Sequence, residues 1–71
     1  MKTVIECVAI SEDRLQDSPK LKTLLMLEAV WFDSVLGVYY INIENPLATL
    51  LLVRFPVIAH NGIQPITVTV N

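Results

Sequence analysis

The distribution of charge along the chain is the feature that most constrains its fold. Ten of the twelve charged residues lie within the first 33 positions, and the 38 residues from Ser34 to Asn71 carry only Glu44 and Arg54. An apolar segment of that length lies inside a protein, against a partner or in a membrane. The C-terminal half must therefore be covered, either by the rest of the chain or by something outside it.

The size of the chain limits how much apolar surface it can bury alone. Of its 71 residues 54% are hydrophobic and the net charge is −2, which excludes a disordered chain. The length predicts one small domain, residues 1–71, and a domain of this size buries only about 60% of the surface that its unfolded chain exposes. We expect apolar surface to remain that a single copy cannot cover.

Composition also excludes several classes of function. There is no basic cluster, so we expect no nucleic-acid partner. The two glycines are too far apart for a phosphate-binding loop, and one cysteine with one histidine cannot build a structural zinc site. We predict no catalytic residue, no cofactor and no metal. The single Cys7 points to a reducing compartment, the cytoplasm.

Charged residues within the apolar runs argue against a targeting segment and against a membrane-spanning helix. The apolar run after Met1 is interrupted by Glu6 and lacks a cleavage site, which favours a mature N-terminus. The stretch 21–43 is long enough to span a bilayer, but it contains Lys22, Glu28 and Asp33. Association with a membrane surface remains an alternative, although the expected basic face is missing.

Residue types that favour, start or end secondary structure predict the first strand and the first helix. Residues 3–10 are rich in β-branched side chains and favour a strand. Ser18 followed by Pro19 is a helix start, and Gly37 can end a helix in the left-handed conformation, so we predict one long helix over about 19–36.

The second half predicts short strands. They are expected at about 38–43, 47–55, 57–60 and 66–70, with a short helix from Pro46 as the alternative for 47–55. Asn61-Gly62 is a hairpin signal, but Pro56 and Pro65 would fall at positions that need an N–H, so we predict a loop over 60–65.

Together these elements predict an α+β fold in which the long helix packs on a small, mainly antiparallel sheet. A parallel crossover between the first two strands stays open. Seven apolar or aromatic residues are left as interface candidates by their position on the helix or strands. They are Met26, Val30, Tyr39, Tyr40, Ile66, Val68 and Val70.

Two charges stand in apolar surroundings. Glu28 falls within the apolar sector of the predicted helix, and Arg54 is the single cation of the uncharged half. We predict an ion pair between them, within the chain or across an interface, against the alternative that both reach solvent at the rim. The paired arrangement predicts that Arg54→Met destabilises the protein far more than loss of Lys22.

These features favour a non-enzymatic protein that buries apolar surface by homo-oligomerisation or by docking in a larger assembly, as an accessory, structural or inhibitory subunit. The alternative is a small enzyme or ligand-binding module with a pocket near Glu28, Tyr40 and His60. The further alternative is the membrane-surface protein already mentioned.

Overall fold

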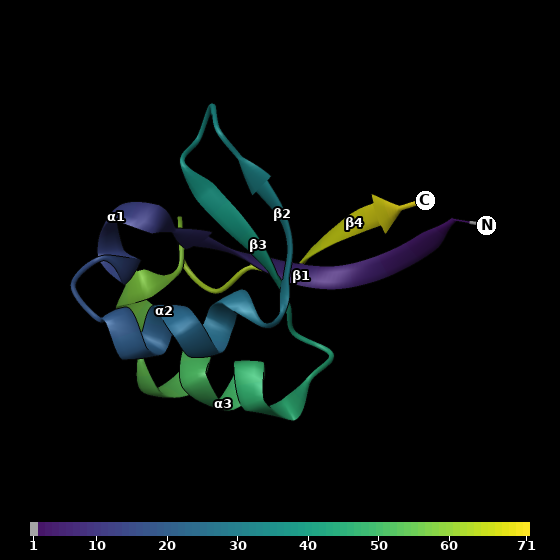
Figure 1. Ribbon diagram of the computed structural model, residues 1–71. Helices are drawn as coiled ribbons and strands as arrows, with labels where there is room; N and C mark the ends of the chain where they lie inside the picture. Colours follow the sequence, from purple (N-terminus) through teal and green to yellow (C-terminus); the bar gives the residue numbers. More distant parts are fainter. Residues whose placement is uncertain (1) are drawn as a thin grey trace.

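A four-stranded antiparallel sheet carries three short helices on one side (Figure 1). The structure is a computed structural model that describes residues 2–71. The elements are β1 (Thr3–Ser11), α1 (Glu12–Leu15), α2 (Pro19–Met26), β2 (Ala29–Asp33), β3 (Val38–Asn42), α3 (Pro46–Arg54), a 3-10 turn η1 (Pro56–Ile58) and β4 (Ile66–Val70). The strand order is β2-β3-β1-β4, so β2 and β4 are the edges.

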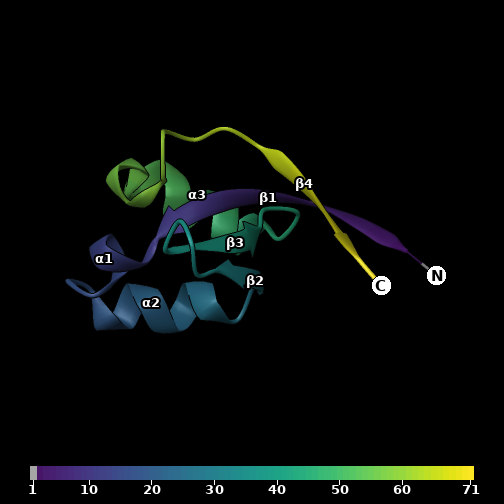
Figure 2. The same cartoon turned by 90° about the horizontal axis from the view of Figure 1, so that it is seen from above.

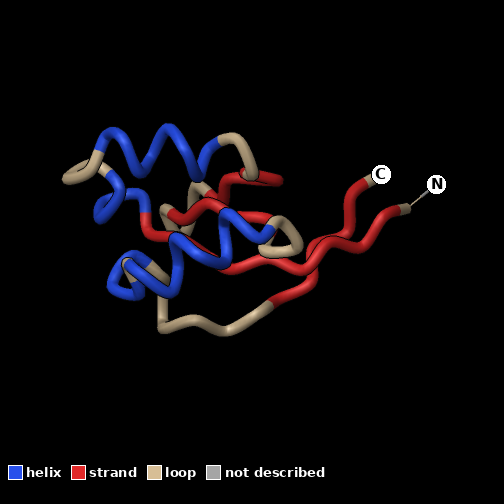
Figure 3. The backbone as a smooth tube through the Cα atoms, turned by 90° about the horizontal axis from the view of Figure 1, so that it is seen from below, coloured by secondary structure: helices blue, strands red, loops and turns tan. Residues whose placement is uncertain are grey.

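Strand β1 joins two parts of the sheet. Its C-terminal half, from Cys7 to Ser11, pairs with β3, whereas its N-terminal half, from Thr3 to Cys7, pairs with β4. The outer half of β1 and β4 form a two-stranded arm that extends away from the helices, with the start of β1 and the end of β4 at its tip (Figures 2 and 3). Only the inner half of β1 lies over the helical layer.

The core lies between the sheet and the helices. Val8 and Ile10 of β1 and Ile41 of β3 are fully buried against residues from all the helical segments. The helical side of this core consists of Leu15, Leu21, Leu25, Ala48, Leu51, Leu52, Ile58 and Ala59. The Arg14 guanidinium also donates a hydrogen bond to the Val57 carbonyl, which ties α1 to η1.

The predicted long helix over 19–36 is wrong. Helix α2 ends at Met26, and residues 29–33 form strand β2, which pairs with β3. Val30, Trp31 and Phe32 are β-branched or aromatic and favour a strand once they can pair. Gly37 does adopt a positive φ of 67°, but it closes the β2–β3 turn and not a helix.

The two strands predicted within 47–60 are also wrong. Residues 46–54 form α3, the helix that was the stated alternative, because Asn45 caps it and Pro46 fits its first turn. Residues 56–58 form η1, and only Ala59 makes an isolated bridge, to Ile10.

Strands are present at the three other predicted places, as β1, β3 and β4, and residues 60–65 form a loop. All strand neighbours are antiparallel, so the parallel crossover does not occur among residues 2–71. The corrected fold is therefore an α+β arrangement with three short helices and a curled antiparallel sheet.

Candidate interaction surface

One face of the sheet has no helix on it. Opposite residues in antiparallel strands share a face, so the partners of Ile5, Cys7 and Ala9 lie on the side away from Val8 and Ile10. We call this side the concave face. The strand residues on this side are Thr3, Ile5, Cys7, Ala9, Ser11, Trp31, Asp33, Val38, Tyr40, Asn42, Ile66, Val68 and Val70. Nine of these thirteen are apolar or aromatic, and Asp33 is the one charged residue among them. Cys7 and Val38 are fully buried, whereas Ile66 and Val70 are each about a third exposed or slightly more.

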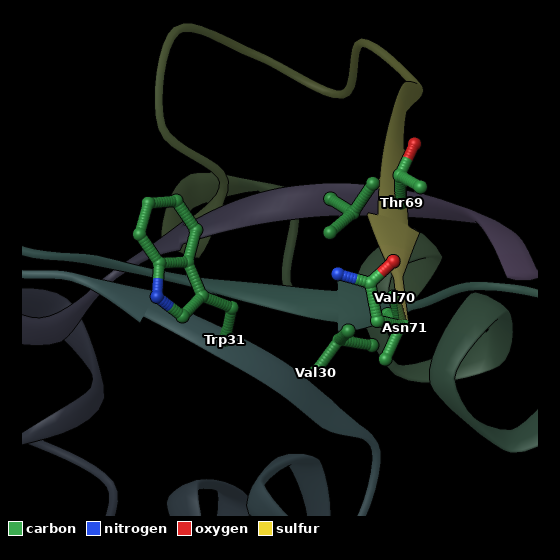
Figure 4. A pocket seen from close by; sticks show the side chains of 6 residues that line it. Val30, Trp31, Thr69, Val70 and Asn71 are labelled. Atoms are coloured by element: carbon green, nitrogen blue, oxygen red, sulfur yellow. The ribbon is translucent and has the colours of Figure 1, made fainter. Parts of the chain in front are cut away.

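The sheet curls around this face. A cavity of about 420 Å³ is lined by Val30 and Trp31 of β2 and by residues 68–71 at the end of the chain. Figure 4 shows these side chains facing one another from β2 and β4. Because β2 and β4 are opposite edges of the sheet, their shared cavity shows that the sheet bends toward a half-barrel.

An aromatic platform stands at the β2 side of the concave face. Trp31 stacks on Tyr40 with ring centroids 5.3 Å apart and an interplanar angle of 7°. The Tyr40 hydroxyl donates to Asp33 Oδ2 at 3.3 Å. Burial, the Asp33 charge and this hydrogen bond together raise the pKa of Tyr40, so it remains a neutral donor. Trp31 is nevertheless 57% exposed, and fixed exposed aromatic rings are typical interface anchors.

The edge of β4 is open and unprotected. Natural edge strands are usually blocked by charges, prolines or bulges, and residues 66–70 contain none of these. The other edge, β2, has a register irregularity between Ala29 and Trp31 and ends in Asp33. Of the two edges, β4 is the one on which no charge, proline or register irregularity opposes pairing with another strand.

A second apolar surface lies on the outside of the helical layer. It consists of the exposed side chains of Leu24, Leu27, Leu47, Leu50, Val53 and Phe55, and we call it the helical patch. A groove of about 240 Å³ between α2 and α3 is lined by Leu24 and Phe55 of this set and by Lys20. Helices α2 and α3 carry Lys20, Lys22 and Arg54 but no carboxylate.

The predicted interface candidates divide between the two sides of the sheet. Val30 lines the concave cavity, and Tyr40, Ile66, Val68 and Val70 lie on the concave face. Met26 and Tyr39 instead pack against the core. Tyr39 contacts Phe32 with ring centroids 4.5 Å apart.

The structure does not bring Glu28 and Arg54 together. Glu28 Oε1 accepts a hydrogen bond from Asn45 Nδ2 at 2.7 Å, at the start of α3, while Arg54 is exposed at its end. Nine residues of helix separate those two ends by about 13 Å. Glu28 therefore has an amide partner and not a cation, and a pairing across an interface stays a prediction.

The three residues of the expected pocket, Glu28, Tyr40 and His60, take part in separate contacts. The His60 amide donates to the Ala9 carbonyl at 2.8 Å, and Tyr40 lies opposite Ala9, so these two flank the same residue of β1. Glu28 points to α3 instead. Neither cavity described above is lined by any of the three.

The residues with reactive chemistry are few and separate. Cys7 is a free, fully buried thiol, and burial, with a contribution from the Glu44 charge, raises its pKa. Among residues 2–71, no group of three or more His, Cys, Asp or Glu side chains is arranged to hold a metal ion. Within the same residues, no helix has both the length and the apolar character needed to cross a membrane.

Sequence reasoning missed Trp31 and the helical patch. It included Trp31 in the predicted helix over 19–36, and it treated Leu47 and Leu50 as parts of a strand. The repeat of Asn45-Pro46 after the earlier Ser18-Pro19 was the available signal for a second helix, and the spacing of Leu47, Leu50 and Val53 then puts them on one side of it.

Comparison with known proteins adds no relative. No protein-family model, curated protein or solved structure matches the chain.

Proposed function

We propose that this protein is a non-enzymatic subunit that associates with a second copy of itself through the concave face. The observation that carries the proposal is the largely apolar side of the sheet that carries no helix, where Trp31, Val68 and Val70 line an open cavity. Obligate dimer interfaces have this character, that of a hydrophobic core cut in half.

The size of the chain supports a stable contact of this kind. A standard protein interface takes about 800 Å² from each partner, which is about one-sixth of the 4741 Å² surface of this chain. The concave face also contains few charged groups, so little desolvation opposes the contact. The buried free thiol of Cys7 supports a reducing compartment, and we propose the cytoplasm.

The single tryptophan makes this association measurable. Trp31 lies at the concave face, so its fluorescence should shift to shorter wavelength as the protein is concentrated and water leaves the ring. Light scattering after size-exclusion chromatography should give the mass of a dimer or a higher multiple at micromolar concentration.

A matched pair of variants tests whether the concave face is the surface through which the two copies associate. Trp31→Lys should shift the protein toward the monomer, whereas Val35→Lys should not, because Val35 is 91% exposed at the tip of the β2–β3 turn. Circular dichroism would verify that both variants fold. A wild-type protein that stays monomeric at the highest soluble concentration would contradict the proposal, as would equal effects of the two substitutions.

A second candidate function, association with an anionic membrane surface, is favoured by the helical patch. Its exposed leucines lie on helices that carry Lys20, Lys22 and Arg54 and no carboxylate. An apolar helix face bordered by cations is the arrangement of interfacial helices.

Vesicle flotation tests this candidate. Binding should be stronger to vesicles that contain phosphatidylserine than to neutral phosphatidylcholine vesicles, and Leu50→Glu should reduce it. Thr23→Glu, at an exposed polar position of α2, is a control for added charge. Equal binding of the wild type and Leu50→Glu would reject the helical patch as a membrane-binding surface.

A further inference from the structure

We propose that two copies pair antiparallel through their β4 edges, around a two-fold axis that passes through Val68. This inference rests on the proposed self-association and specifies its geometry. The β4 edge has no neighbour among residues 2–71, and its residues 66–70 pair on the other side with β1. A second β4 strand is the occupant that its sequence fits.

The sequence of β4 matches its own reverse by residue class. With Val68 on the axis, Ile66 faces Val70 of the second copy, Thr67 faces Thr69, and Val68 faces Val68. Every cross-strand pair is then either two β-branched apolar residues or two threonines, which are favourable pairs in antiparallel sheets. Centring the axis on Thr67 or Thr69 shortens the paired stretch, and centring it on Thr67 also brings Pro65 into the ladder.

The two-fold axis also places the apolar surfaces together. An axis perpendicular to the sheet keeps the same face of both copies on the same side, and each sheet bends toward that face. The two concave faces therefore become continuous and turn toward each other across the axis. The strand order becomes β2-β3-β1-β4 followed by its reverse, an eight-stranded sheet. The helical layers then lie together on the opposite side.

Electrostatics favours this edge over the other. No Asp, Glu, Lys or Arg occurs after Arg54, so two β4 strands meet without like charges. The nearest carboxylate on the paired strand is Glu6, which lies opposite Thr67 and therefore one strand away from the new contact. At the β2 edge, by contrast, the strand irregularity and Asp33 would oppose self-pairing.

Cysteine cross-linking tests the register. In a Cys7→Ala background, Val68→Cys should form an intermolecular disulfide under mild oxidation, because directly opposite residues have Cα atoms within about 5.5 Å. Thr67→Cys alone should cross-link about tenfold more slowly, because Thr67 of the second copy lies diagonally at about 7–8 Å. Mixing Thr67→Cys chains with Thr69→Cys chains should restore fast cross-linking. Non-reducing electrophoresis and mass spectrometry measure the products.

The outcomes separate this inference from the function on which it rests. A dimer by light scattering in which Val68→Cys cross-links no faster than Thr67→Cys would overturn the β4 pairing and leave self-association standing. A monomer at every concentration, with no cross-linking, would overturn both. Fast cross-linking at Val68 together with the mixed Thr67 and Thr69 product supports the stated register.

Discussion

At the scale of single residues, Asn45 joins three parts of the fold. Its Oδ1 accepts from the Leu47 amide at 2.9 Å and caps α3, and its Nδ2 donates to Glu28 Oε1 at 2.7 Å. The Glu28 carbonyl in turn accepts from the Asn42 amide at 2.8 Å. One amide side chain thus fixes the start of α3 against the segment that enters β2.

Asn45→Ala should lower the free energy of unfolding by about 1–2 kcal/mol, because it removes the helix cap and leaves the Glu28 carboxylate without its donor. Asn45→Asp keeps a capping oxygen but places a second carboxylate beside Glu28, so it should also destabilise. Urea denaturation measures both. An aspartate variant as stable as the wild type would show that the contact with Glu28 contributes little.

Cys7 should be slow to react in the folded protein. It is fully buried with a raised pKa, so thiol reagents should label it far more slowly than after unfolding. The unfolded thiol ionises near its ordinary pKa of about 8.5, before the folded one does. Stability should therefore be unaffected by this group below that pH and fall as the pH rises above it. Rapid labelling of the native protein would contradict its burial.

At the scale of elements, the β2–β3 turn depends on one backbone conformation. Asp33 Oδ1 accepts from the amides of Val35 and Leu36, the Gly37 amide donates to the Asp33 carbonyl, and Gly37 has φ of 67°. Gly37→Ala should cost about 1–2 kcal/mol, because a Cβ is strained in this region. A Cβ there would meet nothing within 4 Å, so Gly37→Asn, which tolerates this conformation, should cost less. Equal losses for the two variants would exclude backbone strain as the cause.

Helix α3 changes what is expected of Arg54. Because Arg54 is exposed at the end of α3 and far from Glu28, Arg54→Met should change the free energy of unfolding by only about 0.5 kcal/mol, similar to Lys22→Met. Leu52→Ala, at a buried position of the same helix, should cost about 2–5 kcal/mol. A large effect of Arg54→Met alone in the associated protein would instead indicate an ion pair across the interface.

The elements that sequence predicts well are those with one consistent signal. The alternation of Ile66, Val68 and Val70 with threonines allows only a strand, and β4 is a strand. The segment after Met26 is ambiguous, because consecutive apolar residues such as Val30, Trp31 and Phe32 fit a helix face as well as a strand. No proline or glycine occurs there before Gly37, so nothing local marked the end of α2.

The candidate surface was predictable only in part. Tyr40 and the apolar residues of β4 could be named because alternation in a strand assigns them to one side. Met26 and Tyr39 could not be separated from them, because which side the helices cover depends on contacts between distant segments. Trp31 was missed because the strand that contains it, β2, was predicted as part of a helix.

At the scale of the whole molecule, apolar surface remains on two opposite sides, the concave face and the helical patch. If folding and self-association are coupled, the thermal midpoint must depend on protein concentration. A hundredfold dilution should lower the midpoint by about 5–10 °C, and Trp31→Lys should abolish the dependence. Calorimetry or circular dichroism over that concentration range measures it; a constant midpoint would indicate a stable monomer.

The two-stranded arm has a consequence for the order of folding. The pairing of Thr3 with Val70 joins residues 67 positions apart, whereas the β2–β3 hairpin closes a short turn. Closing so long a loop has a high entropic cost, so β4 should dock after the hairpin and helices have formed. Until then the outer half of β1 is an unoccupied template, and at high concentration β4 from a neighbouring chain can occupy it, which would produce strand-exchanged dimers during refolding.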